Sequence, residues 1–244
     1  MRNLNNYEFT ILVPFYNEQA NIYNLEKALS EFIQKSIVPQ TCILFINDGS
    51  TDNGEQLVEE ICSRNNHFYY LSLARNIGLS GALKAGFDYC HSRLVGYMDA
   101  DLQTTPMDFN LLLPYACEFP LVTGIRSNRK DDFFKNLQSK IANGFRRYMT
   151  KDDAVDTGCP LKVLQTEYAR RIPMFTGMHR FFPALILLQD GGRVKQVPVS
   201  HFPRMAGVSK YHLWNRLIGP FKDCFAYRWM KKRYLNYSVD KTNL

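Results

Sequence analysis

Patterns typical of strands and helices alternate four times within the first hundred residues. Apolar runs that favour buried strands occupy 9–13, 42–46, 68–72 and 94–98, with two more at 121–125 and 194–199. Helical spacing or helix signals cover 22–33, 54–63 and 79–90. This alternation predicts one α/β domain of Rossmann-like architecture, in which a mostly parallel sheet carries helices on both faces.

Polar side chains follow three of these strands at the point where each strand ends. Tyr16 and Glu18 follow the first strand, Asp48 follows the second, and Asp99 follows the fourth. We expect them at one edge of the sheet, where open α/β sheets bind ligands. An aromatic ring with acceptor carboxylates suits a nucleoside. Asp48 also begins Asp-Gly-Ser-Thr-Asp, which is typical of a turn and helix cap, so both interpretations remain open.

The turn after the fourth strand carries Asp99, Asp101 and Gln103 at i, i+2 and i+4, and Pro106 stands where a helix can begin. Three oxygen ligands at this spacing can share one hard cation, Mg²⁺ or Mn²⁺, whose remaining positions are filled by water and phosphate. The alternative is an Asp-rich turn that caps the following helix.

The two halves of the chain carry opposite charge. Residues 1–122 have a net charge of −7 and residues 123–244 a net charge of +14. The sequence contains neither a Gly-x-Gly-x-x-Gly fingerprint nor a P-loop, so a nucleoside diphosphate would depend on a metal ion and basic side chains. Arg126 follows a strand, Lys135 and Ser139 share a helix face, and Arg204 opens a basic loop. A solvated basic surface is the alternative.

The C-terminal stretch combines apolar and basic residues. Its apolar stripe is flanked by Lys and Arg, and comprises Leu213, Trp214, Leu217, Ile218, Phe221 and Phe225. A basic amphipathic helix suits an anionic membrane surface, whereas a stripe docked on the domain's own core is the alternative. The six cysteines show no Cys-x-x-Cys spacing, the chain starts with polar residues, and no apolar run is long enough to span a bilayer. These features predict a cytoplasmic protein with reduced thiols.

The motifs together resemble family 2 of the glycosyltransferases, which has the GT-A fold. The first-half matches are Val13-Pro14-Phe15-Tyr16-Asn17-Glu18, Asn47-Asp48-Gly49-Ser50-Thr51-Asp52, Arg75-Asn76-x-Gly78 and Asp99-Ala-Asp101-Leu-Gln103. The second half is similar to the polyprenyl-phosphate branch, which includes dolichol-phosphate mannosyltransferases and undecaprenyl-phosphate sugar transferases. Its matches are Gly124-Ile-Arg126, Lys135-x3-Ser139-Lys140-x2-Asn143, Asp156-Thr-Gly158, Val197-Pro-Val and Arg204-x2-Gly207-x-Ser209-Lys210-Tyr211.

The resemblance covers residues 9–225 and implies a role for each matched site. The nucleoside of a UDP- or GDP-sugar would be bound by Pro14, Tyr16, Glu18, Asp48 and Asp99, and a divalent ion by Asp99, Asp101 and Gln103. The lipid phosphate would be received by Arg126, Lys135 and Ser139, with Arg204 reaching the donor diphosphate. Family members often have Arg at position 135, where Lys cannot bind phosphate in a bidentate manner, and many carry C-terminal membrane spans.

These features predict a GT-A domain at 1–210 with a basic amphipathic tail at 211–244. The predicted reaction is inverting, metal-dependent transfer of a sugar to polyprenyl phosphate, with Asp101, Arg126 and Arg204 as catalytic residues. A phosphate monoester is already anionic at pH 7 and needs no general base, and residues 176–182 contain no acid. We expect a peripheral enzyme on the inner face of the cytoplasmic membrane, with an anionic membrane surface or a small membrane protein as partner.

Two alternatives remain at this point. A glycosyltransferase with a sugar-hydroxyl acceptor would need Asp156 or His179 as general base. A non-catalytic anion or nucleic-acid binder would suit the isoelectric point of about 9.0. Nucleic acid is not expected as a partner, because the basic residues are not interleaved with aromatic residues as a stacking platform requires.

Overall fold

The computed structural model describes residues 6–127, 144–203, 213–236 and 240–241. Lys135, Ser139 and Arg204 lie outside this part of the chain, as do the side chains of the apolar stripe up to Ile218. Their predicted roles therefore stay predictions.

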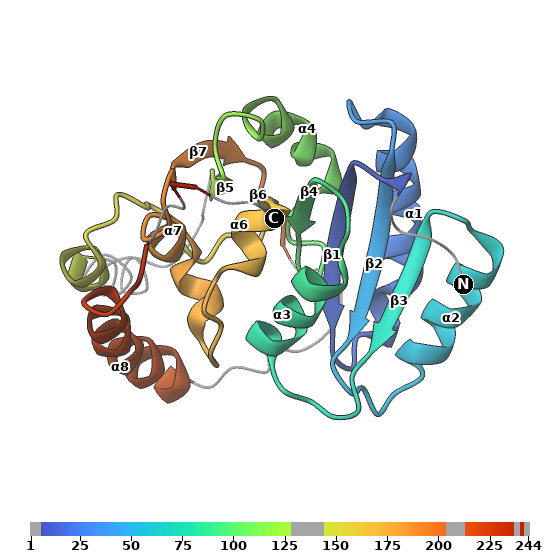
Figure 1. The fold of residues 1–244 in the computed structure, drawn as a ribbon. Helices are drawn as coiled ribbons and strands as arrows, with labels where there is room; N and C mark the ends of the chain where they lie inside the picture. The colour runs from blue at the N-terminus through green and yellow to red at the C-terminus, as the bar shows by residue number, and fades with distance from the viewer. Residues whose placement is uncertain (1–5, 128–143, 204–212, 237–239, 242–244) are drawn as a thin grey trace.

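A seven-stranded sheet in the order β3-β2-β1-β4-β6-β5-β7 forms the centre of the molecule (Figure 1). The strands are β1 (Phe9–Phe15), β2 (Thr41–Asn47), β3 (Phe68–Ser72), β4 (Leu94–Tyr97), β5 (Leu121–Arg126), β6 (Lys162–Gln165) and β7 (Val194–Val199). The first four are parallel to one another, and β5 is parallel to β7, which confirms the mostly parallel sheet. The carboxyl ends of β1, β2 and β4 therefore lie at one edge.

Strand β6 was not predicted, and it runs antiparallel to both β4 and β5. It is four residues long and contains Lys162, so it gives only a weak apolar signal. Its effect is to join the parallel half of the sheet to the pair β5 and β7. Arg126, at the end of β5, thereby belongs to the same sheet as β4, which Asp99 follows.

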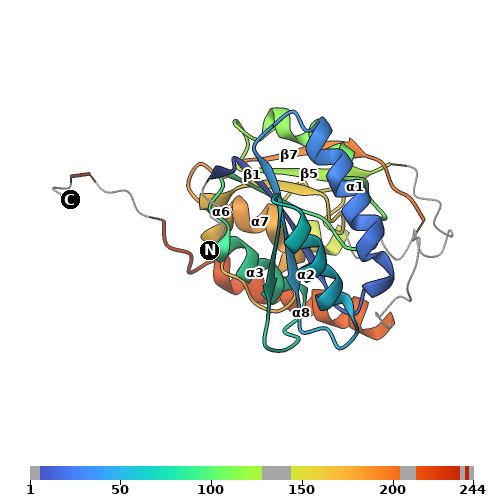
Figure 2. The same ribbon diagram turned by 90° about the vertical axis from the view of Figure 1, so that its right-hand side faces the viewer.

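Helices cover both faces of the sheet, as predicted (Figure 2). One face is packed by α1 (Ile22–Lys35), α2 (Gly54–Arg64) and α4 (Phe109–Leu112), which follows the 3-10 turn η3 (Pro106–Asp108). The other face is packed by α3 (Leu79–Tyr89), α6 (Thr166–Arg170), the 3-10 turn η5 (Met178–Phe181), α7 (Phe182–Ile186) and α8 (Leu213–Lys231). Alternate residues of each central strand enter opposite cores: Ile11 and Val13 lie in one, and Leu12 lies in the other.

Helix α8 continues through Gly219-Pro220, beyond the predicted apolar stripe. Its described residues Cys224, Tyr227 and Met230 are buried in the core, whereas Phe221 and Phe225 of the predicted stripe are exposed. No helix in the described part of the chain is long and apolar enough to cross a bilayer. The division into domains at residue 210 stays a prediction.

Gly49 lets two loops of the carboxyl edge meet. Its φ of +69° lies in the left-handed region, and an added Cβ would come within 2.5 Å of the backbone nitrogen of Asn76. Both the backbone conformation and the close approach therefore require glycine.

We expect Gly49→Ala to destabilise the protein by about 2 kcal/mol, from left-handed strain plus displacement of the 75–76 backbone. Gly144→Ala is the matched control, because an added Cβ there meets nothing within 4 Å and the residue is helical. That variant should be neutral or slightly more stable. Urea unfolding measures both, and equal free energies of unfolding would contradict the assigned contact.

Candidate active site

The loops after β1 and β2 are interlocked at the carboxyl edge of the sheet. The backbone N–H of Asn17 donates to Ser50 Oγ at 3.0 Å, and the N–H of Thr51 donates to Asn17 Oδ1 at 2.7 Å. Asn17 adopts a φ of 51°, a conformation that Asn tolerates better than most residues. Tyr16 and Glu18, on either side of Asn17, are thereby positioned beside the loop that begins at Asp48.

Asp48 connects the second loop to the start of α3. Its two carboxylate oxygens accept the N–H groups of Ile77 and Gly78 at 2.8 and 2.9 Å. The side chain is only 5% exposed, and burial raises its pKa although these hydrogen bonds lower it. Asp48 thus has a structural role, and each oxygen keeps a second lone pair for a ligand N–H. Pro14 lies buried in β1, opposite Ile46.

The turn after β4 carries the three predicted metal ligands within five residues of the chain. The N–H of Gln103 donates to Asp101 Oδ1 at 3.1 Å, and Asp101 is buried. Leu102 between them has a φ of 54°, which is rare for a bulky residue and stores strain in the turn.

Asp99 is the electrostatic centre of this turn. The hydroxyl of Tyr97 donates a short hydrogen bond to Asp99 Oδ1. The pKa of Asp99 is raised to about 6, mainly by burial and also by the neighbouring Asp101, against the lowering effects of Tyr97, Lys162 and Arg126. Asp99 is therefore within electrostatic reach of one further carboxylate and two cations at this edge.

Arg126 forms a bidentate ion pair with Asp156. Its Nε and Nη2 donate to the two carboxylate oxygens, each at 2.8 Å, and its backbone N–H donates to Asp156 Oδ2 at 3.2 Å. These side-chain bonds use two of the five guanidinium N–H donors. Arg126 is thus held in place with donors left for an anion.

Lys162 is a buried cation that was not among the site residues predicted from the sequence. Its Nζ donates to the carbonyl of Cys159 and lies 5.8 Å from the centre of the Tyr97 ring. Burial lowers its pKa, whereas Cys159, Asp156 and Asp99 act to raise it. A lysine inside the short apolar run 160–164 is the signal that could have drawn attention to it.

The chain that leads to Arg204 is anchored on the metal-ligand turn. The N–H of Phe202 donates to the carbonyl of Gln103 at 2.9 Å, and Nδ1 of His201 lies 3.1 Å from the same oxygen. The N–H of Ser200 donates to Asp108 at 2.6 Å. Phe202, two residues before Arg204 in the sequence, is the last of these anchored residues.

His179 and Asp156, the bases that a sugar-hydroxyl acceptor would need, are both engaged. Nδ1 of His179 lies 2.8 Å from Ser80 Oγ. The pKa of His179 is lowered to about 3, mainly by burial and also by the nearby cations Arg180 and Lys162. An imidazole with so low a pKa is a weak general base, and Asp156 is neutralised by Arg126.

The residues of the turn suit a hard divalent ion. No cluster of three or more His, Cys, Asp or Glu with metal-site geometry occurs among the described residues. Two mutually repelling carboxylates, with an amide oxygen four residues along the chain, nevertheless form an oxygen donor set. Mg²⁺ and Mn²⁺ accept such a set when substrate phosphate completes their coordination.

Removing the charge of Asp99 should stabilise the ligand-free protein. A pKa near 6 against 3.8 for the free side chain means that ionised Asp99 destabilises the fold, by up to about 3 kcal/mol. The cost is absent at low pH, grows as pH rises from 4, and is complete above 6. Asp99→Asn should therefore raise the melting temperature at pH 7.5 and not at pH 4.

The exposed Asp153 supplies the matched control, since Asp153→Asn makes the same charge change on the surface. Thermal melts between pH 4 and 8 compare the two variants with the wild type. A stability gain for Asp99→Asn that does not depend on pH would contradict the assigned burial of the carboxylate.

Known proteins resemble this chain in sequence and fold. Dodecaprenyl-phosphate galacturonate synthase from Rhizobium johnstonii is 31% identical over 214 residues, covering 84% of this chain; the chain spans 62% of that relative. Crystal structures of glucosyl-3-phosphoglycerate synthase from Mycobacterium tuberculosis share the fold. One of these structures contains phosphoglyceric acid. It matches this chain with a TM-score of 0.67 and 15% identity, and the match covers 94% of this chain and 81% of the synthase chain.

A second structure of that synthase, with Mn²⁺, UDP-glucose and phosphoglyceric acid, has a TM-score of 0.67 and 14% identity over the same shares of the two chains. The fold is therefore GT-A-like, as expected. The model of the family described as glycosyl transferase family 2 matches residues 10–173. The chain belongs to glycosyl transferase family 2.

Proposed function

We propose that this protein transfers a sugar from a UDP- or GDP-sugar to a polyprenyl phosphate, with inversion at the anomeric carbon and with the help of Mg²⁺ or Mn²⁺. The reaction takes place at the inner face of the cytoplasmic membrane. The protein binds there as a peripheral protein, either to the anionic membrane surface itself or to a small membrane protein. The curated relative is named as a polyprenyl-phosphate sugar synthase, which supports this acceptor.

The main observation in support of the proposal is that acidic and basic side chains lie near one another at one edge of the sheet. Asp99 lies within electrostatic reach of Asp101 from the same turn, and of Arg126 and Lys162 from the other half of the sequence. An acidic pair next to guanidinium and ammonium groups suits a reaction between two phosphate-bearing substrates.

Each residue has a distinct part in the proposed reaction. Tyr16, Glu18 and Asp48, with Pro14 beneath them, bind the nucleoside, and Asp99, Asp101 and Gln103 hold the divalent ion. When bound, that ion neutralises the charge of the departing diphosphate. Arg126 orients the acceptor phosphate, together with Lys135 and Ser139, and Arg204 stabilises the leaving diphosphate.

A phosphate oxygen of the acceptor attacks the anomeric carbon as the bond to the donor diphosphate breaks. The nucleophile is already ionised near neutral pH, so no side chain has to remove a proton. The weak basicity of His179 and the pairing of Asp156 with Arg126 favour this acceptor over a sugar hydroxyl.

Asp101→Ala should abolish transfer while the protein stays folded, because the variant removes an oxygen ligand from the turn. Transfer of radiolabelled sugar to polyprenyl phosphate, measured with and without Mn²⁺, tests this role. Full activity of the variant after removal of divalent metal would refute it.

Arg126→Lys should raise KM for polyprenyl phosphate at least tenfold and leave KM for the nucleotide-sugar nearly unchanged. Lysine keeps the charge opposite Asp156 but loses the planar fork that binds phosphate in a bidentate manner. Arg64→Lys, on the exposed face of α2, is the control. An effect confined to the nucleotide-sugar KM would place Arg126 on the donor instead.

The acceptor class is tested directly by offering the protein polyprenyl phosphate and soluble oligosaccharides in parallel. We expect label in the lipid fraction alone. Label in the oligosaccharides would favour the sugar-hydroxyl alternative.

A further inference from the structure

The orientation of the C-terminal half of α8 is set by its buried face. Cys224, Tyr227 and Met230 are buried, and the Tyr227 hydroxyl donates to the carbonyl of Ala184 at 3.2 Å. The Tyr227 ring also stacks on Phe181 with the ring centres 6.1 Å apart. The helix therefore cannot roll about its axis without breaking core contacts.

The opposite face of the same helix carries an aromatic stripe, which we define as Phe221, Phe225 and Trp229. These residues recur every fourth position, so they lie along one side of the helix. They are 51%, 53% and 61% exposed. Phe145, from the helical segment 144–150, stacks on Phe221 at 4.9 Å and ties that segment to α8. The stripe thus points away from the core while its helix is fixed.

Cations flank the stripe on both sides. At 100° per residue, Lys222 falls on one side of it and Arg228 on the other. Lys231 is the last residue of the helix, and Lys232 and Arg233 follow it directly. None of these five forms an ion pair with a described residue. By sequence, the one acidic residue of α8 is Asp223. Within the part of the chain that the structure describes, the charge of this face is therefore uncompensated.

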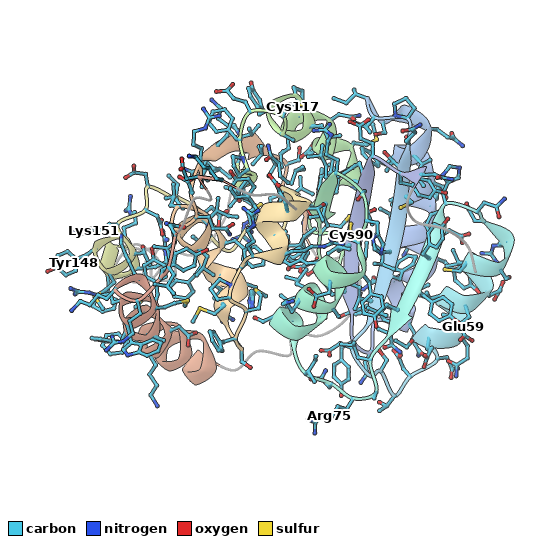
Figure 3. The ribbon with its side chains drawn as sticks, in the orientation of Figure 1. Glu59, Arg75, Cys90, Cys117, Tyr148 and Lys151 are labelled. Atoms are coloured by element: carbon cyan, nitrogen blue, oxygen red, sulfur yellow. The ribbon has the colours of Figure 1, made fainter. Side chains whose placement is uncertain are left out.

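A cavity of about 420 Å³ opens on the side that carries Arg228. Four of its six lining residues are cations, and the set comprises Tyr148, Met149, Lys151, Arg228, Lys231 and Lys232. Tyr148 and Lys151 project from the edge of the molecule beside α8 (Figure 3). The volume suits a small headgroup, and the charge suits a phosphate.

We propose that this cavity binds the headgroup phosphate of an anionic phospholipid, and that the aromatic stripe enters the bilayer interface beside it. Aromatic side chains favour the headgroup level of a bilayer, and flanking Lys and Arg are attracted to its negative surface. The inference rests on the proposed function only in that the acceptor of that reaction lies in the same bilayer. It assigns membrane contact to a defined set of residues separate from Asp99, Asp101 and Arg126.

The arrangement of the rings favours a bilayer over nucleic acid. Phe145 stacks on Phe221 at 4.9 Å, Phe221 and Phe225 meet edge to face at 5.3 Å, and Arg233 lies 5.0 Å from the centre of the Trp229 ring, so one face of Phe221 and one of Trp229 are already occupied. A platform that stacks bases needs open ring faces. A bilayer interface needs only exposed apolar edges.

The test is cosedimentation of the full chain with phosphatidylcholine vesicles that contain or lack phosphatidylglycerol, without donor or acceptor. The wild type should bind the anionic vesicles, and less so as salt rises. Lys231→Gln/Lys232→Gln should weaken this binding about thirtyfold, at about a factor of five per cation lost. Trp229→Ser should weaken it as well, because the interfacial ring is removed.

The matched control is Lys27→Gln/Lys35→Gln, which removes the same charge from exposed positions on α1, on the other face of the sheet. It should bind the vesicles within twofold of the wild type. Equal losses in both double variants, or equal binding to neutral and anionic vesicles, would overturn the proposal. The proposal would also be overturned if the protein failed to bind the vesicles but showed a shift in melting temperature with inorganic phosphate or a gel shift with RNA.

Transfer to a short polyprenyl phosphate dispersed in detergent separates this inference from the proposed function. Lys231→Gln/Lys232→Gln should retain that transfer, because docking is bypassed. A wild type that binds anionic vesicles but transfers no sugar would refute the function and leave the docking site standing.

Discussion

The buried carboxylate of Asp99 is the constraint on which the site depends. Burial and Asp101 destabilise its charge, and Tyr97, Lys162 and Arg126 support it. Such a group raises the energy of the ligand-free protein, and binding of a divalent cation, as we propose, would offset that cost. In the ligand-free protein, Lys162 and Arg126 do not fully compensate the buried charge.

Strand β6 makes this arrangement possible. It pairs with both β4 and β5 in antiparallel fashion and so places Lys162 opposite Tyr97. Asp156, in the segment that leads to β6, fixes Arg126 at the end of β5. A domain with the four parallel strands alone would have the acidic residues of the candidate site without these cations. The antiparallel strand therefore joins the residues that we propose for the donor to those that we propose for the acceptor.

Local patterns predicted the parallel half of the sheet and the positions of Tyr16, Asp48, Asp99 and Asp101, because strand ends and turns are encoded within a few residues. The pairing of Arg126 with Asp156 spans 30 positions, and that of Ser80 with His179 spans 99. Such contacts depend on tertiary packing, which no local pattern contains. For the same reason the local pattern of the tail did not show which side of α8 enters the core. The fold buries Tyr227, which is outside the predicted apolar stripe, and exposes Phe225, which belongs to it.

The most direct test of the account is the position of Mn²⁺ in crystals grown with UDP or GDP, located by its anomalous scattering. We expect one peak within coordination distance of Asp101 and of the nucleotide diphosphate, on the side of the turn that faces Arg126. A peak remote from Asp99, Asp101 and Gln103, or a bound diphosphate held without metal by other residues, would contradict the central claim.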